Sequence, residues 1–156
     1  MSIILTEPGK RLEFDIIGYE FPDTVSEESG FDANWLLFGF TYTVFPADTD
    51  SNAENGAGQT FVYEDASMLT WELKALYEDI GGLLDGSRDT LATDFTEPYL
   101  SIELGAAGDR FGIKVRFVYD TEKEWKELSV GQYLTRQELS DLAEELKEMY
   151  RRFPQR

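Results

Sequence analysis

The sequence predicts an α+β fold in a single domain spanning residues 1–156. We expect a mainly antiparallel β-sheet of about five to seven strands, with two amphipathic helices packed on one face. Two observations predict it: several segments alternate apolar and polar residues, and two others carry apolar residues at helical spacing. A chain of 156 residues can bury roughly two-thirds of its unfolded surface, so one domain can be stable without disulfides or metals.

The central strand of the predicted sheet lies within residues 34–45, a stretch without charged residues. Every second residue is large and apolar, in the order Leu36, Phe38, Phe40, Tyr42 and Val44. This alternation is typical of a strand with one buried face. The connections on either side of it are acidic, at residues 20–32 and 48–54.

Other segments show the same alternation. Strands are predicted at residues 3–5, 11–19, 60–64, 99–104, 111–119 and 128–133, with Trp125 in a polar connection. Residues 60–64 are expected to pair with the central strand, residues 99–104 and 111–119 to form a second hairpin, and residues 128–133 to be a short edge strand. No internal repeat and no second domain are evident.

Two helices are predicted from leucine-rich stripes. The first covers residues 70–84, with Thr70 as its N-cap and Gly86 just beyond its end. The second covers residues 135–153, where Thr135 and Glu138 form a capping box and Pro154 ends the helix. Each helix has one apolar face and one charged face.

Charge is distributed unevenly. The net charge of -17 comes from 14 Lys and Arg against 31 Asp and Glu, and no base lies between Leu12 and Leu73. This field would repel phosphate backbones and anionic membranes, so nucleic acid is not expected as a direct ligand. A basic protein is the natural partner, although the same charge could serve solubility alone.

The absence of two residue types restricts the chemistry. The chain has no Cys and no His, which removes disulfides, thiol nucleophiles and every Ser-His or Cys-His arrangement. Residues 1–8 lack the features of a signal peptide, and no stretch is apolar enough to span a membrane. We therefore expect a cytoplasmic protein.

One acidic run resembles a calcium-binding loop. Asp48, Asp50 and Asn52 match its first ligand positions, but Ala53 stands where Gly must turn the chain and Gln59 where a bidentate Glu must close the shell. No metal site and no cofactor are predicted.

A hydrolase that uses only carboxylates is a further alternative. It would need a pocket that holds two carboxyl groups with separated pKa values. Glu64 and Asp65 are adjacent in sequence, but neighbours on a strand point to opposite faces of a sheet. The sequence therefore identifies no catalytic pair.

Short motifs are spread along nearly the whole chain, at residues 18–22 (GYEFP), 32–36 (DANWL), 69–73 (LTWEL), 95–100 (FTEPYL), Trp125 and 152–156 (RFPQR). In this order they resemble the WapI-type immunity proteins of bacteria. The resemblance implies a non-enzymatic cytoplasmic protein that binds the toxic C-terminal domain of a contact-delivered or secreted toxin made by the same cell. In the best known case that domain is a nuclease acting on tRNA, an activity that cannot be transferred to other members.

The predicted function is therefore neutralisation of a cognate toxin domain, expected to be a basic RNase or DNase, through an acidic surface. The alternative is an acidic binding module for a small ligand or another protein. An acidic surface would imitate the charge of a nucleic acid and accelerate encounter with a basic partner. The predicted contact residues are Asp23, Glu27, Glu28, Asp32, Asp48, Asp50, Glu54, Glu64 and Asp65.

Overall fold

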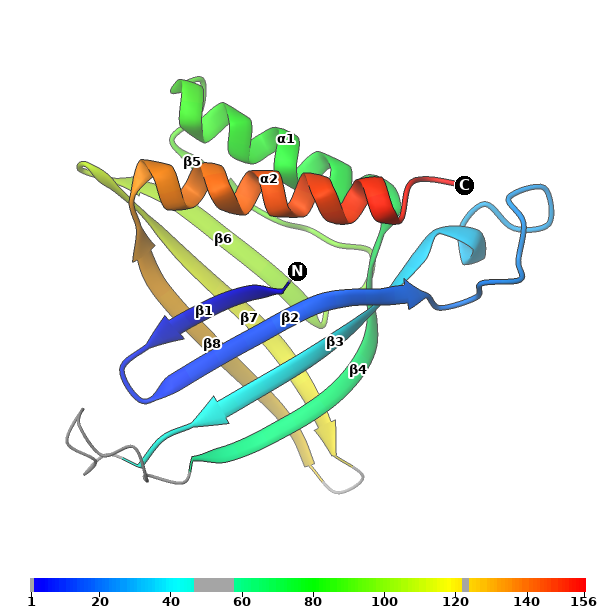
Figure 1. The fold of residues 1–156 in the computed structure, drawn as a ribbon, viewed down its shortest axis with the longest axis horizontal. Helices are drawn as coiled ribbons and strands as arrows, with labels where there is room; N and C mark the ends of the chain where they lie inside the picture. The colour runs from blue at the N-terminus through cyan, green and yellow to red at the C-terminus, as the bar shows by residue number, and fades with distance from the viewer. Residues whose placement is uncertain (1, 47–57, 122–123) are drawn as a thin grey trace.

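The computed structural model describes residues 2–46, 58–121 and 124–156. Within these residues the chain forms two four-stranded antiparallel sheets and two α-helices (Figure 1). The first sheet contains β1 (Ile3–Glu7), β2 (Lys10–Tyr19), β3 (Trp35–Val44) and β4 (Gln59–Leu69). The second contains β5 (Thr90–Ala92), β6 (Leu100–Ala107), β7 (Arg110–Thr121) and β8 (Glu124–Leu134). Helix α1 (Thr70–Asp85) follows β4 and helix α2 (Arg136–Arg152) follows β8.

The predicted α+β class with two helices is confirmed, but the predicted number of strands is wrong. The described residues form eight strands in two sheets, and the order of four strands followed by a helix occurs twice. Strand β5 was not predicted because it has only three residues. Strand β8 is longer than expected and includes Trp125, which is 58% exposed. As an edge strand with polar side chains, β8 shows only a weak alternation in its first half.

The central position of β3 is confirmed, because β3 pairs with β2 on one side and β4 on the other. Its residues Leu36, Phe38, Phe40 and Tyr42 are buried, as the alternation predicts. The Phe40 ring stacks on Tyr63 of β4, with 4.8 Å between centroids, and lies 6.3 Å from Phe117 of the second sheet. The core therefore lies between the inner faces of the two sheets.

The two helices lie side by side over the same side of the sheets (Figure 1). A small gap in the core is lined by Leu76 of α1, Leu146 of α2, Phe14 of the first sheet and Ile113 of the second. Both helices and both sheets therefore share one core. Its members are apolar and almost completely buried, which makes this shared core the main source of stability.

The helix boundaries confirm most of the predicted capping. Gly86 adopts a left-handed conformation (φ 78°) at the C-cap of α1. At the start of α2, Glu138 N–H donates to Thr135 Oγ1 (3.2 Å), and Thr135 N–H donates to the Glu138 carboxylate (2.7 Å). The prediction of Thr70 as an N-cap is wrong: Leu69 is the N-cap of α1 and Thr70 is its first helical residue. The Thr70 hydroxyl is engaged in a tertiary hydrogen bond instead, described below.

Candidate functional site

The connection between β2 and β3, residues 20–34, protrudes from the end of the first sheet (Figure 1). We call it the 20–34 loop. Backbone hydrogen bonds close it at its base, where Glu20 N–H donates to Trp35 O (3.0 Å). Within the loop, Ala33 N–H donates to Ser29 O (3.0 Å) and Asn34 N–H to Phe31 O (2.9 Å), which forms the short 3₁₀ helix Asp32–Asn34. The loop thus has a defined backbone conformation.

Asn34 is the polar centre of this loop and is only 1% exposed. Its Oδ1 accepts hydrogen bonds from the Thr70 hydroxyl and from Arg156 N–H, both at 2.9 Å. Its Nδ2 donates to Gly30 O (2.8 Å) and to Arg156 O (3.1 Å). All the hydrogen-bonding capacity of this buried amide is therefore used, which ties the loop to α1 and to residue 156.

The Arg156 side chain reaches into the loop from the segment that follows α2. Its guanidinium group donates to Phe21 O (2.9 Å), Pro22 O (2.8 Å) and Ala33 O. The same group lies 3.9 Å from the centroid of the Tyr19 ring. Because the planar guanidinium satisfies carbonyls on both arms of the loop, it holds the two arms together. The sequence contained Arg156 in a family motif, but spacing alone gave no sign of this role.

Four of the predicted contact residues lie on the 20–34 loop with exposed side chains: Asp23, Glu27, Glu28 and Asp32. The ion pairs formed within the described residues include none of these four. Some carboxylates elsewhere are paired, such as Asp79 with Arg88 (2.7 Å). These four carboxylates therefore form no ion pair with a base of the described chain, and the Arg156 guanidinium is engaged by backbone carbonyls instead.

Asp65 lies near the base of this loop, together with two acids outside the predicted set, Glu20 and Glu97. Burial, followed by repulsion from Asp65 and Asp32, raises the pKa of Glu20. Burial, followed by repulsion from Asp65 and Glu20, raises the pKa of Glu97. Burial also raises the pKa of Asp65, against hydrogen bonds from Ser67 and Ala66. Glu20, Asp65 and Glu97 thus form one acidic cluster, with Asp32 of the loop close to Glu20.

Glu97 is positioned by its neighbour in the chain. Thr96 donates from its N–H (2.6 Å) and its hydroxyl (2.7 Å) to the Glu72 carboxylate at the start of α1. This anchors the segment before β6 beside the 20–34 loop. Glu20 and Glu97 both lie in the motifs that carry the family resemblance, and Glu20 also belongs to the acidic connection identified from the sequence.

Of the remaining predicted residues, the structure describes only Glu64. Glu64 pairs with Gly39 and Asp65 with the buried Phe38, so the two acids point to opposite faces of the first sheet. Asp48, Asp50 and Glu54, and the run that resembles a calcium loop, lie outside the described residues.

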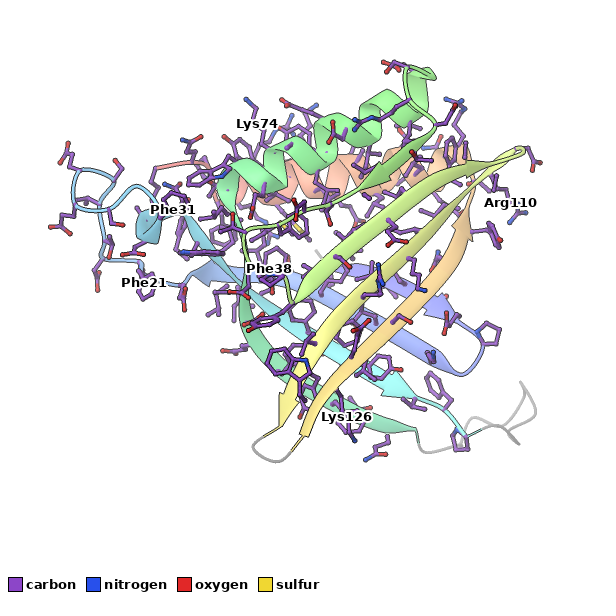
Figure 2. All side chains as sticks on the ribbon, turned by 180° about the vertical axis from the view of Figure 1, so that it is seen from behind. Phe21, Phe31, Phe38, Lys74, Arg110 and Lys126 are labelled. Carbon is purple, nitrogen blue, oxygen red and sulfur yellow. The ribbon has the colours of Figure 1, made fainter. Side chains whose placement is uncertain are left out.

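Apolar side chains are exposed on the same loop. Phe21, Val25 and Phe31 are 42%, 48% and 56% exposed. The edge of the Phe31 ring packs against Trp71 of α1, with centroids 5.4 Å apart and rings at 87°. Figure 2 shows Phe21 and Phe31 on the protruding segment, at the opposite end of the molecule from Arg110. The loop thus combines acidic and aromatic groups on one protrusion.

A hollow of about 980 Å³ lies elsewhere, over the β1–β2 turn and the outer face of β6, β7 and β8. Its two carboxylates are each held by a base: Glu7 by Lys10 (2.8 Å) and Glu103 by Arg116. The bond from Lys10 and another from the Gly131 N–H lower the pKa of Glu7. Both carboxylates that line this hollow are therefore engaged in ion pairs.

Two further observations bear on metals and membranes. Among residues 2–46, 58–121 and 124–156, no group of three or more carboxylates is placed to hold a metal ion. None of the helices that the structure describes has the length and apolar character needed to cross a bilayer.

Two solved structures resemble this fold distantly. WHY3 from Arabidopsis thaliana aligns with a TM-score of 0.42 and 10% identity, over 96% of this chain and 86% of that chain. A protein of unknown function from the DUF155 family of Prochlorococcus sp. NATL2A aligns with a TM-score of 0.30 and 15% identity, over 96% and 99%. Similarity at this level supports no conclusion about function.

No match was found among curated protein sequences. In contrast, the Immunity protein WapI-like family matches residues 3–154, which is nearly the whole chain. The motifs at 18–22, 32–36, 69–73 and 95–100 fall within that match and correspond to the base of the 20–34 loop, the start of α1 and the segment before β6. The chain belongs to the WapI-like immunity protein family.

Proposed function

We propose that this protein is a non-enzymatic immunity protein that binds and neutralises the C-terminal domain of a cognate bacterial toxin. The partner is a basic nuclease domain, and the contact surface is the acidic 20–34 loop with the adjoining carboxylates of Asp65 and Glu97. We propose that it acts in the cytoplasm, where a toxin that attacks RNA or DNA meets its substrate. Membership of the immunity protein family supports the class of function.

One observation carries the choice of surface. The exposed carboxylates of Asp23, Glu27, Glu28 and Asp32 have no ion-pair partner within the described residues. A nuclease binds phosphates through Lys and Arg, so its substrate-binding surface is complementary to such a loop. Binding there would occlude the site without any chemistry by the immunity protein.

The cluster at the base of the loop strengthens this complementarity. Burial raises the pKa values of Glu20, Asp65 and Glu97, and repulsion from Asp65 adds to this effect at Glu20 and Glu97. A cationic partner would relieve that repulsion when it binds. Favourable electrostatics of this kind mainly accelerate association, by roughly 10- to 1,000-fold.

Co-expression tests the proposal directly. The toxin domain encoded beside the gene is produced in a sensitive strain, with or without this protein. We expect growth to be restored and the two proteins to co-purify as a complex. Continued growth arrest, with both proteins accumulating but not co-purifying, would contradict the proposed function.

A further inference from the structure

The 20–34 loop exposes bulky apolar side chains in a short acidic segment. Phe21, Val25 and Phe31 are each more than two-fifths exposed, and the loop also carries five acids and no base. Single exposed apolar residues are ordinary on protein surfaces. Three of them lie on one protrusion that also carries five acids, and the Trp71 ring packs against Phe31; we call these four side chains the apolar patch.

The backbone beneath this patch is fixed in the free protein. The carbonyl of Phe21 accepts from the Arg156 guanidinium (2.9 Å), and the carbonyl of Phe31 accepts from Asn34 N–H (2.9 Å). Trp71 supports the Phe31 ring from the side. A rigid aromatic group loses little conformational entropy when it binds, so residues presented in this way are suited to be anchors of an interface.

We infer that Phe21 and Phe31 are the anchor residues of the toxin interface and insert into an apolar recess flanked by Lys and Arg on the toxin domain. This inference rests on the proposed function. The carboxylates of the loop select a basic partner, whereas a second copy of this chain would bring two acidic loops together and be repelled. The charges thus govern encounter, and the two rings govern how long the complex persists.

Arg156 is a positioning residue in this arrangement. Its guanidinium group donates hydrogen bonds to the backbone carbonyls of Phe21 and Pro22 on one arm of the loop and of Ala33 on the other. The backbone of Arg156 also exchanges hydrogen bonds with the Asn34 side chain. Lys has one ammonium group and cannot reproduce three directed contacts from a planar fork. Loss of Arg156 should therefore loosen the loop and weaken binding while the loop keeps its anchors and its charges.

The test compares binding kinetics of the catalytically inactivated toxin domain with Phe21→Ser and Phe31→Ser. Val62→Ser and Tyr133→Ser are matched controls, because these side chains are 69% and 66% exposed on other surfaces. We expect each loop variant to raise the dissociation rate at least about 10-fold with an unchanged salt dependence of association, and the controls to leave both unchanged. Thermal unfolding of each variant verifies folding, and Phe31→Leu replaces Phe31→Ser if the latter is unstable.

The outcomes separate this inference from the proposed function. If the wild-type protein does not bind the toxin domain, both are overturned. If the wild type binds but the Phe21 and Phe31 variants dissociate at the rate of the controls, the inference alone is overturned. Formation of dimers of this chain that the Phe→Ser variants abolish would assign the patch to self-association and would also overturn it.

Hydrogen–deuterium exchange tests the role of Arg156. Arg156→Ala and Arg156→Lys should both accelerate exchange at the amides of Ala33 and Asn34 in the free protein, and both should weaken toxin binding. Exchange in β3 and α1 should remain slow. Unchanged exchange in the loop would contradict the positioning role, and faster exchange with unchanged affinity would show that the fixed backbone does not serve binding.

Discussion

Asn34 and Arg156 exchange a pair of hydrogen bonds although 122 positions separate them in the chain: Arg156 N–H donates to Asn34 Oδ1 (2.9 Å), and Asn34 Nδ2 donates to Arg156 O (3.1 Å). The Thr70 hydroxyl shares the same Oδ1. One buried amide therefore joins the 20–34 loop, the start of α1 and the segment after α2. The shape of the candidate binding surface depends on this junction.

Asn34→Ala should lower the free energy of unfolding by about 2 to 3 kcal/mol, because it leaves buried or half-buried donors and acceptors without partners. The measurement is urea denaturation followed by fluorescence. Gln137→Ala is the matched control, since that exposed amide bonds only to Asp141 on the same helix, and it should change stability by less than about 0.5 kcal/mol. Equal effects of the two variants would contradict the structural role assigned to Asn34.

Removing the charge of the loop should slow association with the toxin domain. The variant D23N/E27Q/E28Q/D32N should lower the association rate at low salt by about 10-fold and flatten its dependence on ionic strength. The control variant D89N/D109N/D141N/E144Q removes the same charge from exposed positions away from the loop. Stopped-flow kinetics over a range of salt concentrations compares the two, and a control as slow as the loop variant would show that net charge alone matters.

The acidic cluster predicts how stability depends on pH. The pKa values of Glu20, Asp65 and Glu97 are raised in the folded protein, so the folded state binds more protons than the unfolded state just above the ordinary values of 4.5 for Glu and 3.8 for Asp. The contribution of the cluster to the free energy of unfolding should therefore rise as the pH falls from neutrality through the raised pKa values.

The variant E20Q/D65N/E97Q isolates this contribution. It should be more stable than the wild type at neutral pH, and its stability should respond less to acidification. Glu64→Gln is the control, because Glu64 lies exposed on the opposite face of the same strand as Asp65. Denaturant titrations at several pH values make the comparison. A triple variant with the same pH profile as the wild type would contradict the raised pKa values of these three carboxylates.

The packing of the two sheets predicts a large effect at Phe40. This ring is 2% exposed and stacks on Tyr63 and Phe117, which belong to different sheets. Phe40→Ala should destabilise the protein by about 3 to 5 kcal/mol. Val62→Ala on the outer face of β4 should cost less than about 0.5 kcal/mol in the same denaturation experiment. Similar costs for both would contradict the position of the core between the sheets.

Most of the local structure could be predicted from the sequence. Alternation identified the buried face of β3, and the capping box at Thr135 and Glu138 fixed the start of α2. The division into two sheets could not be predicted, because it depends on which strands meet across the core. Phe61 and Tyr63 of β4 pack against Tyr119 of β7, a contact between distant segments that no local pattern records.

The candidate site was predictable in part. The charge pattern identified the 20–34 loop, but the predicted contact set kept both Glu64 and Asp65, although alternation places them on opposite faces of β4. Glu20 and Glu97 join Asp65 only through the tertiary fold. The role of Arg156 was equally hidden, because its partners at Phe21, Pro22 and Ala33 lie more than 120 positions away.

The hydrogen–deuterium exchange footprint of the complex with the inactivated toxin domain tests the proposed interface most directly. We expect protection of amides in residues 20–34 and around Asp65 and Glu97, with little change on the outer face of the second sheet. A footprint confined to the hollow that Gly105, Gly112 and Tyr133 line, with the 20–34 loop unprotected, would contradict it.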